Sequence, residues 1–378
     1  MVRSVLVALL CGLIVACGGG GGGSSTTPAR SFAMGFTDFP HANSISAVNA
    51  AFTVITNDAD MAVMHFDDGV PWAEALDNVN NGTRYLTTYH TNFLNSIAYK
   101  KSKIPVGHVL YLAVTPLNFF RNGLADHRGA GGNEALIAPW SGYALDHVDV
   151  IAAYTQHCLN MIDAFSPDYF AYAIEANMLY SSRPGQWPAF INLARSVYTS
   201  IKAVHPNLPV FVTLQTGYFH GDVINQTTAI NRILPYTDMI AVSAYPYSIQ
   251  SDPNLLAADY FSALADLAPA KPFAVAETAW PAEDITDVNN NTIVLIPADE
   301  AAQNTYIKRL LSDADILSAK FVTLFFTRDY DDFWESDFKF LANAQLFRLW
   351  KDTGLYDGTG NPRISLNIWR QYLNRIRQ

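Results

Sequence analysis

The segment of residues 272–281, PFAVAETAWP, decides the fold of this 378-residue chain. It contains a short apolar run that stops on the carboxylate Glu277. Such a run is typical of a buried parallel strand, and the acid then lies at the rim of the sheet. A second segment, YFAYAIE at residues 169–175, ends in the same way on Glu175. Two glutamates that end separate strands predict a pair of reactive carboxylates at one mouth of a β/α barrel.

Short apolar runs alternate with stretches of helical periodicity from residue 31 onward. This order indicates parallel strands joined by helices, and we predict an α/β fold, a (β/α)8 TIM barrel, as a single domain over residues 31–378. A doubly wound open sheet is the alternative, but it would leave the strand-end acids without a shared mouth. The predicted strands are 33–37, 61–66, 106–114, 169–174, 210–214, 239–243, 273–276 and 321–326, and the clearest helices are 148–165, 188–204, 255–267 and 299–311.

The amino-terminal residues have the pattern of a targeting segment. Arg3 precedes an apolar stretch, residues 5–15, that is too short to span a bilayer. Residues 14–17, IVAC, resemble the lipobox of bacterial lipoproteins. That resemblance implies cleavage before Cys17 and lipidation of this cysteine, and an ordinary secretory signal is the alternative.

We therefore divide the amino-terminal region into a signal peptide, residues 1–16, and a Gly/Ser-rich tether, residues 17–30. Gly18 lacks the aspartate that retains many lipoproteins at the inner membrane. The prediction is a chain anchored by lipid in the bacterial cell envelope, with the outer membrane as the favoured location.

Composition excludes some functions. The net charge is -10 and no run of Lys or Arg occurs, so we expect no nucleic-acid partner. Cys11 leaves with the signal peptide, and Cys158 then has no partner for a disulfide and is expected to be buried in a helix. Spacings such as CxxC or HExxH are absent, so we predict no metal and no cofactor. A monomer is expected.

Polar and aromatic residues follow nearly every predicted strand, where barrel enzymes place their working residues. Carboxylates and amides bind hydroxyl groups, and flat aromatic faces stack on sugar rings, so the expected ligand is a carbohydrate. Beside the two glutamates, the predicted binding residues are Asp38, His65, Asp67, Trp72, Asn177, Gln215, Tyr218, Tyr245, Tyr247, Trp280 and Arg328.

Two segments carry a resemblance to a known family. Residues 275–281, VAETAWP, and 238–247, DMIAVSAYPY, resemble strands seven and six of clan A glycoside hydrolases, most closely the endo-β-1,4-galactanase family. The resemblance implies a retaining mechanism with Glu277 as nucleophile and Glu175 as acid/base. It also implies that Tyr245 hydrogen-bonds the nucleophile.

The chain departs from that family at three positions. Ile174 stands where the family has the asparagine that binds the sugar 2-hydroxyl, and Asn177 replaces it only if the loop turns back. His65 and Asp67 stand in the region of the family's strand-two arginine. The strand-eight tryptophan is replaced by Phe or Thr.

Several residues have a structural interpretation beside the functional one. Glu277 could pair with Arg328, and Glu175 could be an ordinary rim residue. Asp67 and Asp68 could form a turn, His65 could be a rim histidine whose hydrogen bonds are satisfied, and residues 329–332 could form a solvated loop. Trp72 and Trp280 could be core residues, and Trp140 and Trp187 could pack under loops.

The favoured hypothesis is a lipid-anchored retaining glycoside hydrolase acting on a neutral polysaccharide or oligosaccharide outside the cytoplasm. The first alternative is a non-catalytic glycan-binding lipoprotein on a degenerate barrel, which Ile174 favours. A barrel enzyme of another reaction class is less consistent, because phosphate-binding glycine loops are absent.

Overall fold

The computed structural model describes residues 29–83 and 86–378. The predicted signal peptide, the predicted lipidation site Cys17 and most of the predicted tether therefore lie outside the described residues. Within the described ranges, no helix is both long and apolar enough to cross a membrane.

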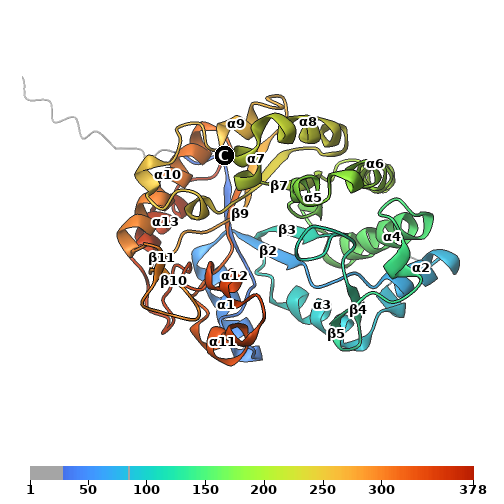
Figure 1. Ribbon diagram of the computed structural model, residues 1–378, viewed down its shortest axis with the longest axis horizontal. Coiled ribbons are helices and arrows are strands. Elements are labelled where there is room, and N and C mark those ends of the chain that lie inside the picture. Colours follow the sequence, from blue (N-terminus) through green and yellow to red (C-terminus); the bar gives the residue numbers. More distant parts are fainter. Residues whose placement is uncertain (1–28, 84–85) are drawn as a thin grey trace, which may run out of the picture.

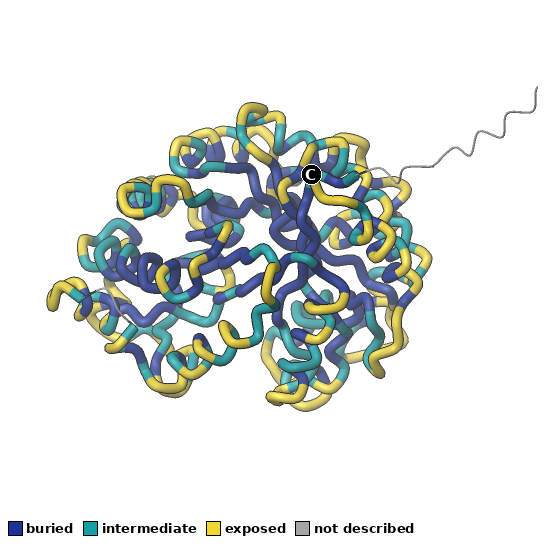
Figure 2. Tube along the Cα trace, turned by 180° about the vertical axis from the view of Figure 1, so that it is seen from behind, coloured by how far each residue is buried: buried dark blue, intermediate teal, exposed yellow. Residues whose placement is uncertain are grey.

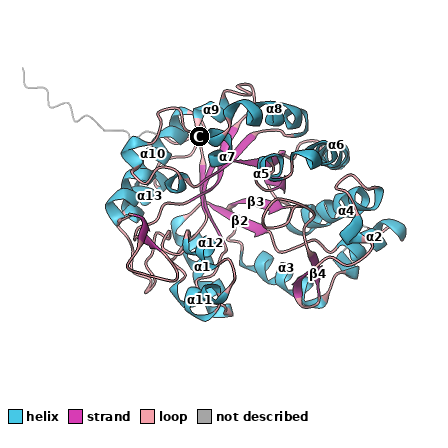
Figure 3. Ribbon diagram, in the orientation of Figure 1, coloured by secondary structure: helices cyan, strands magenta, loops and turns pink. Residues whose placement is uncertain are grey.

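A closed barrel of eight parallel strands forms the centre of the molecule, and helices surround it (Figures 1 and 3). The predicted (β/α)8 TIM barrel is confirmed. Around the barrel, β1 neighbours both β2 and β12, which closes the sheet. The strands are β1 (Ala33–Thr37), β2 (Met61–Phe66), β3 (Val109–Val114), β6 (Tyr169–Ala173), β7 (Val210–Gln215), β8 (Ile240–Ala244), β9 (Phe273–Thr278) and β12 (Phe321–Leu324).

The longer helices are α1 (Ile45–Asp58), α2 (Trp72–Asn80), α3 (Thr91–Lys103), α4 (Val148–Phe165), α6 (Trp187–Val204), α8 (Val223–Ile233), α10 (Glu300–Ile316) and α13 (Ser365–Leu373). Shorter elements lie mainly in the loops: the hairpin strands β4 (His127–Gly129), β5 (Gly132–Glu134), β10 (Ile285–Thr286) and β11 (Val294–Ile296), and the helices α5 (Asn177–Ser182), α7 (Thr216–Gly221), α9 (Ser262–Ala265), α11 (Asp331–Ser336) and α12 (Ala344–Arg348). The 3-10 turns are η1 (Leu86–Thr88), η2 (Trp140–Gly142), η3 (Pro184–Gln186), η4 (Leu234–Tyr236), η5 (Pro246–Ser248), η6 (Pro253–Leu255) and η7 (Phe338–Phe340).

All eight predicted strands are present, and most of their ends agree within two residues. The third strand starts three residues later than predicted. Val106 is exposed there and Gly107 has a φ of +86°, so the chain turns before the strand begins. The prediction for α10 is confirmed at its start, because the Asp299 side chain accepts a hydrogen bond from the Ala302 amide and caps the helix.

The predicted helix over residues 255–267 is wrong, because only the four residues of α9 are helical. The backbone carbonyls of Ala257 and Ala258 accept hydrogen bonds of 3.0 and 2.9 Å from the Arg309 guanidinium on α10. These carbonyls are therefore directed at α10 and not along a helix axis. The apolar residues of this segment have helical spacing, but hydrogen bonds to another helix determine its backbone conformation.

Large side chains fill the barrel interior, and Figure 2 shows that the chain at the centre of the molecule is buried. The Tyr111 ring lies 5.1 Å from Phe321 and 5.6 Å from Phe211, centroid to centroid. Ile174 belongs to the same cluster and is completely buried. This layer separates the two ends of the barrel and forms a rigid floor beneath its carboxyl-terminal mouth.

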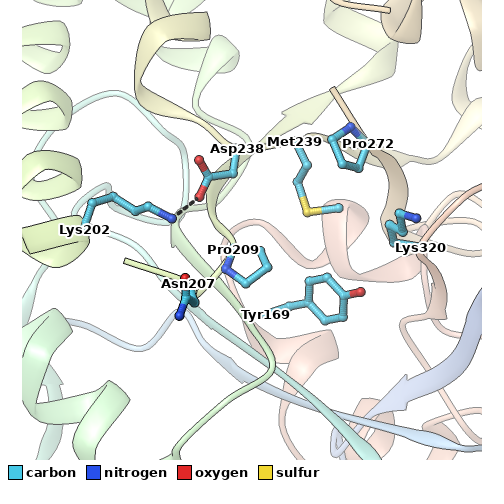
Figure 4. Close-up of a pocket in the computed structure, with 8 residues that line it drawn as sticks. All are labelled: Tyr169, Lys202, Asn207, Pro209, Asp238, Met239, Pro272 and Lys320. Atoms are coloured by element: carbon cyan, nitrogen blue, oxygen red, sulfur yellow. Dashed lines mark hydrogen bonds and ion pairs between the residues drawn. The ribbon is translucent and has the colours of Figure 1, made fainter. Parts of the chain in front are cut away.

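A small cavity of about 280 Å³ lies at the amino-terminal end of the strands (Figure 4). An ion pair in its wall joins Lys202 Nζ to Asp238 Oδ2 at 2.9 Å, and Asp238 also accepts hydrogen bonds from Tyr198 and the Val210 amide. These groups satisfy one another and tie helix α6 to β7 and β8. The amino-terminal end of such a barrel contributes to stability, and catalytic residues lie at the carboxyl-terminal end.

Candidate active site

A cavity of about 560 Å³ opens at the carboxyl-terminal ends of the strands, which is a typical volume for a ligand site. Both predicted glutamates line it. Of the other predicted binding residues, those that line it are His65, Asp67, Gln215, Tyr218, Tyr245 and Tyr247.

Glu277 is the penultimate residue of β9, and its side chain is almost completely buried. One carboxylate oxygen lies 3.1 Å from His65 Nε2 at the end of β2. The other accepts a 3.1 Å hydrogen bond from the Tyr245 hydroxyl, which follows β8. The structure thus places the predicted tyrosine on the predicted nucleophile. It does not pair Glu277 with Arg328, whose guanidinium donates to the Gly358 carbonyl.

The environment of Glu277 favours the ionised form. Burial alone would raise its pKa, but the charge and hydrogen bond of His65, the charge of Arg121 and the hydrogen bond from Tyr245 outweigh it and hold the pKa of Glu277 below its ordinary value. Burial likewise opposes protonation of His65, yet the charge of Glu277 raises the pKa of this imidazole. Each group of this pair thus favours the charged form of the other.

Glu175 directly follows β6 and occupies a different environment. Burial is the main cause that raises its pKa to about 8, and the nearby charge of Glu277 adds to the rise. Arg121 opposes the shift, but its guanidinium lies 3.6 Å from Glu175 while it binds both oxygens of Asp67 at 2.6 and 2.9 Å. Glu175 is therefore a protonated carboxylic acid at neutral pH.

The backbone is also unusual at this point. Among the described residues, four that are not glycine have a positive φ, and Glu175 (51°) and Arg121 (52°) are two of them. Such a conformation costs roughly 1–2 kcal/mol for an L-residue, and it persists where the surrounding structure enforces it. The Glu175 amide donates a 2.7 Å hydrogen bond to Thr213 Oγ1, which helps to hold this turn.

Two predicted aromatic platforms are core residues instead. Trp72 is completely buried, stacks on Trp140, and donates its indole N–H to the Ala125 carbonyl. Trp280 is also buried and stacks on Tyr306 at 4.9 Å. Both predictions of sugar contact are wrong, because Trp140 and the α4 residue Tyr154 pack on the Trp72 ring, and Tyr306 of α10 packs on the Trp280 ring. The expected loop position of Trp187 is also wrong, since it begins α6 in the core.

Three predicted polar contacts do not reach the cavity either. Asp38 is buried against Lys100, and Arg328 is directed at Gly358. Asn177 is completely buried, where it bonds both backbone groups of Gln215. Asn177 therefore cannot take the place of the asparagine whose position Ile174 occupies. The expected solvated loop at residues 329–332 is wrong for Asp329, which is buried and paired with Arg363.

Sequence reasoning missed Arg121 and several aromatic residues. Arg121 lies in the loop after β3, the one strand end that yielded no candidate, and its position after a predicted strand was the available signal. The aromatic side chains that line the cavity but were not predicted include Phe119, Phe120, Phe347 and Trp350. Phe347 and Trp350 come from the long segment after β12, for which the sequence offered no motif.

Comparison with known proteins gives a likeness of fold only. No family model and no curated protein matches the sequence. A family 5 glycoside hydrolase from Streptomyces cattleya, solved with Manβ1-4GlcNAc, aligns with a TM-score of 0.61 at 13% identity over 92% of this chain and 83% of its own. A family 53 catalytic domain from Ignisphaera aggregans aligns with a TM-score of 0.52 at 14% identity, over 86% of this chain and 88% of its own.

An exo-β-1,4-mannosidase from Opitutaceae bacterium strain TAV5 aligns with a TM-score of 0.57 at 12% identity over 91% of this chain, which spans 59% of the mannosidase. These neighbours are glycoside hydrolases, and they share the barrel fold of this chain. The likeness to the family 53 domain does not exceed the likeness to family 5, so the resemblance to galactanases stays a prediction.

The electrostatics of the site can be tested directly. We expect the carboxyl carbon of Glu175 to titrate in a 13C NMR experiment with an apparent pKa near 8. In the Asp67→Asn variant this pKa falls, because a negative charge is lost and Arg121 becomes free to pair with Glu175. Asp68→Asn, one residue away, serves as the control and should shift it less. An unchanged or higher pKa in Asp67→Asn would contradict the arrangement.

Proposed function

We propose that this chain is a retaining glycoside hydrolase that cleaves a neutral polysaccharide or oligosaccharide, with Glu277 as nucleophile and Glu175 as acid/base. One observation carries the proposal. Two buried carboxyl groups at the ends of β6 and β9 line the same cavity, and their surroundings shift their pKa values in opposite directions. A double displacement at a glycosidic bond requires two carboxyl groups whose pKa values differ in this way, so that one is ionised while the other is protonated.

The residues supply each step of that reaction. The protonated Glu175 donates its proton to the glycosidic oxygen as the bond to the anomeric carbon breaks, and the ionised Glu277 attacks that carbon. The resulting glycosyl ester is released when Glu175, now a carboxylate, removes a proton from water. His65 and Tyr245 hold the two oxygens of Glu277, so the nucleophile is oriented before the substrate arrives.

The remaining surface of the cavity supports a sugar ligand. Phe120 and Tyr218 are partly exposed at its mouth, and the Trp350 ring lies 5.9 Å from the ring of Tyr245, which binds the nucleophile. Aromatic faces of this kind stack on the apolar faces of sugar rings. The basic residues that line the cavity, Lys100, Arg121 and His65, are already paired with Asp38, Asp67 and Glu277, which supports a neutral substrate.

A second function has one observation in its favour. Ile174 replaces the asparagine that the resemblance would place before the acid, and it is buried inside the barrel. The amide that would bind the sugar 2-hydroxyl is therefore missing from that position. A glycan-binding protein without turnover is the alternative, and hydrolysis assays on a panel of polysaccharides separate the two.

The glutamates provide the first test. Glu277→Gln is expected to lower kcat by several orders of magnitude on every substrate, because the amide cannot form the ester. Glu175→Gln is expected to cost about 10²- to 10⁴-fold on a natural glycoside and much less on an aryl glycoside, whose leaving group needs no proton. Glu283→Gln, outside the cavity, is the control. Unchanged turnover in either cavity variant would refute the assignment.

The pH dependence provides the second test. Activity requires the proton on Glu175, so kcat/KM should fall as the pH rises through about 8. It requires an ionised Glu277, so the acid limb should lie below the ordinary glutamate pKa of about 4.3. Glu175→Gln should lack the alkaline limb. A profile with its alkaline limb near pH 5 would contradict the roles proposed for the two groups.

We further propose that the chain is anchored to the bacterial cell envelope by lipid on Cys17, with the outer membrane favoured; the lipobox-like residues 14–17 support this. Cells that express the protein should incorporate labelled fatty acid into it, and Cys17→Ser should abolish the label. Cys11→Ser is the matched control, because Cys11 would leave with the signal peptide. Equal labelling of the Cys17→Ser variant would exclude the anchor.

A further inference from the structure

Outside the cavity, two histidines and one glutamate from three separate elements converge at one side of the barrel. Glu74 lies in the first turn of α2, His90 is the residue before α3, and His127 is the first residue of β4. Figure 1 shows these three elements on the same side of the molecule. They are too far apart in sequence for a spacing motif to reveal them, which is why the sequence predicted no metal.

The geometry of the three donors is that of a small coordination site. His90 Nε2 lies 3.1 Å and His127 Nε2 lies 3.4 Å from the same carboxylate oxygen of Glu74. All three donor atoms lie within 4.8 Å of one another. In a tetrahedral site with metal–ligand bonds of about 2.0–2.1 Å, neighbouring ligand atoms are roughly 3.3 Å apart, so both contacts have the length of a tetrahedral edge.

The protein groups alone leave this cluster incomplete. Both imidazoles are directed at one oxygen of Glu74, and the other oxygen is buried without a hydrogen-bond partner among the described residues. A buried acceptor left without a partner costs free energy. A cation between the three donors would satisfy the carboxylate, and the partial exposure of both histidines leaves a path for it to enter.

We propose that Glu74, His90 and His127 bind one divalent transition-metal ion, with Zn²⁺ as the best match. Two imidazoles and one carboxylate are a ligand set of zinc, whereas Mg²⁺ and Ca²⁺ require mostly oxygen ligands. The three ligands leave a fourth position for water. The site does not depend on the proposed glycosidase activity.

The position of the ion gives it a structural role. His127 pairs with Val70 in a β-bridge, and the Arg128 guanidinium lies 3.3 Å from Asp68. Asp67, which binds Arg121 in the cavity, directly precedes Asp68 in the chain. A metal that joins α2, α3 and β4 therefore fixes the hairpin against the segment that carries Asp67, and it stiffens this wall of the cavity.

The test is a zinc titration of the full mature chain, without a polyhistidine tag, after treatment with a chelator. We expect one Zn²⁺ per chain by calorimetry. At a free Zn²⁺ concentration about 100 times the Kd, the Tm should rise by about 4 °C, because a ligand that binds only the folded state stabilises it by linkage. Mg²⁺ at the same concentration should leave the Tm unchanged. Co²⁺ bound in place of zinc should show the intense visible absorption of tetrahedral coordination.

Variants distinguish this site from adventitious binding. His127→Ala and Glu74→Gln should each weaken zinc binding by at least 100-fold and abolish the rise in Tm. His205→Ala is the matched control, since His205 also lies beside one carboxylate, at 3.7 Å from Asp163, but belongs to no three-donor cluster among the described residues; this variant should bind zinc like the parent. No stoichiometric binding by the parent chain, or equal affinity in the two site variants, would overturn the proposal, and the parent titration decides even if a variant fails to fold.

Discussion

Three carboxyl groups and two cations are buried together at the mouth of the barrel, and the chemistry of the site depends on how they share charge. Asp67 is held by both guanidinium nitrogens of Arg121, and Glu277 is held by His65 and Tyr245. Among the residues that the structure describes, the only ion pair of Glu175 is the 3.6 Å contact with Arg121. An unpaired buried charge costs several kcal/mol, so the cluster is most stable with one proton on the carboxyl that has the weakest partner. That carboxyl is Glu175, in agreement with the acid role proposed for it.

The barrel explains why this balance is fixed in space. His65 and Glu277 are themselves strand residues, and Glu175 is held in a left-handed turn whose amide donates to Thr213 on β7. The Asn177 side chain ties this segment to the end of β7, because its amide group donates to the Gln215 carbonyl and accepts from the Gln215 amide N–H. It does not bind the ligand, but it helps to position Glu175. Below them, the packed interior around Tyr111 and Phe321 prevents the strand ends from shifting.

The fold and the two glutamates were predictable because they depend on local pattern. Apolar runs fix the strands, and the end of each run fixes which residue reaches the mouth. Trp72 and Trp280 show where this reasoning stops: both follow strands, yet neighbouring helices bury their rings, and burial depends on packing that one sequence does not display. Arg121 and Trp350 were missed for the complementary reason. They reach the cavity from loops, whose paths no periodicity encodes.

The charges of the cluster also bear on the choice between catalysis and binding alone. A sugar-binding barrel has no need for a buried acid with a raised pKa beside a buried carboxylate, and replacing buried ion pairs by apolar residues is often neutral or stabilising. This chain keeps them, and it holds Glu175 and Arg121 in backbone conformations that cost energy. The positive charge that the resemblance would place on strand two is supplied by His65 on β2 and by Arg121 from the loop after β3. A different set of residues thus places positive charge beside the two glutamates, as the proposed cleavage requires, and Ile174 does not belong to that set.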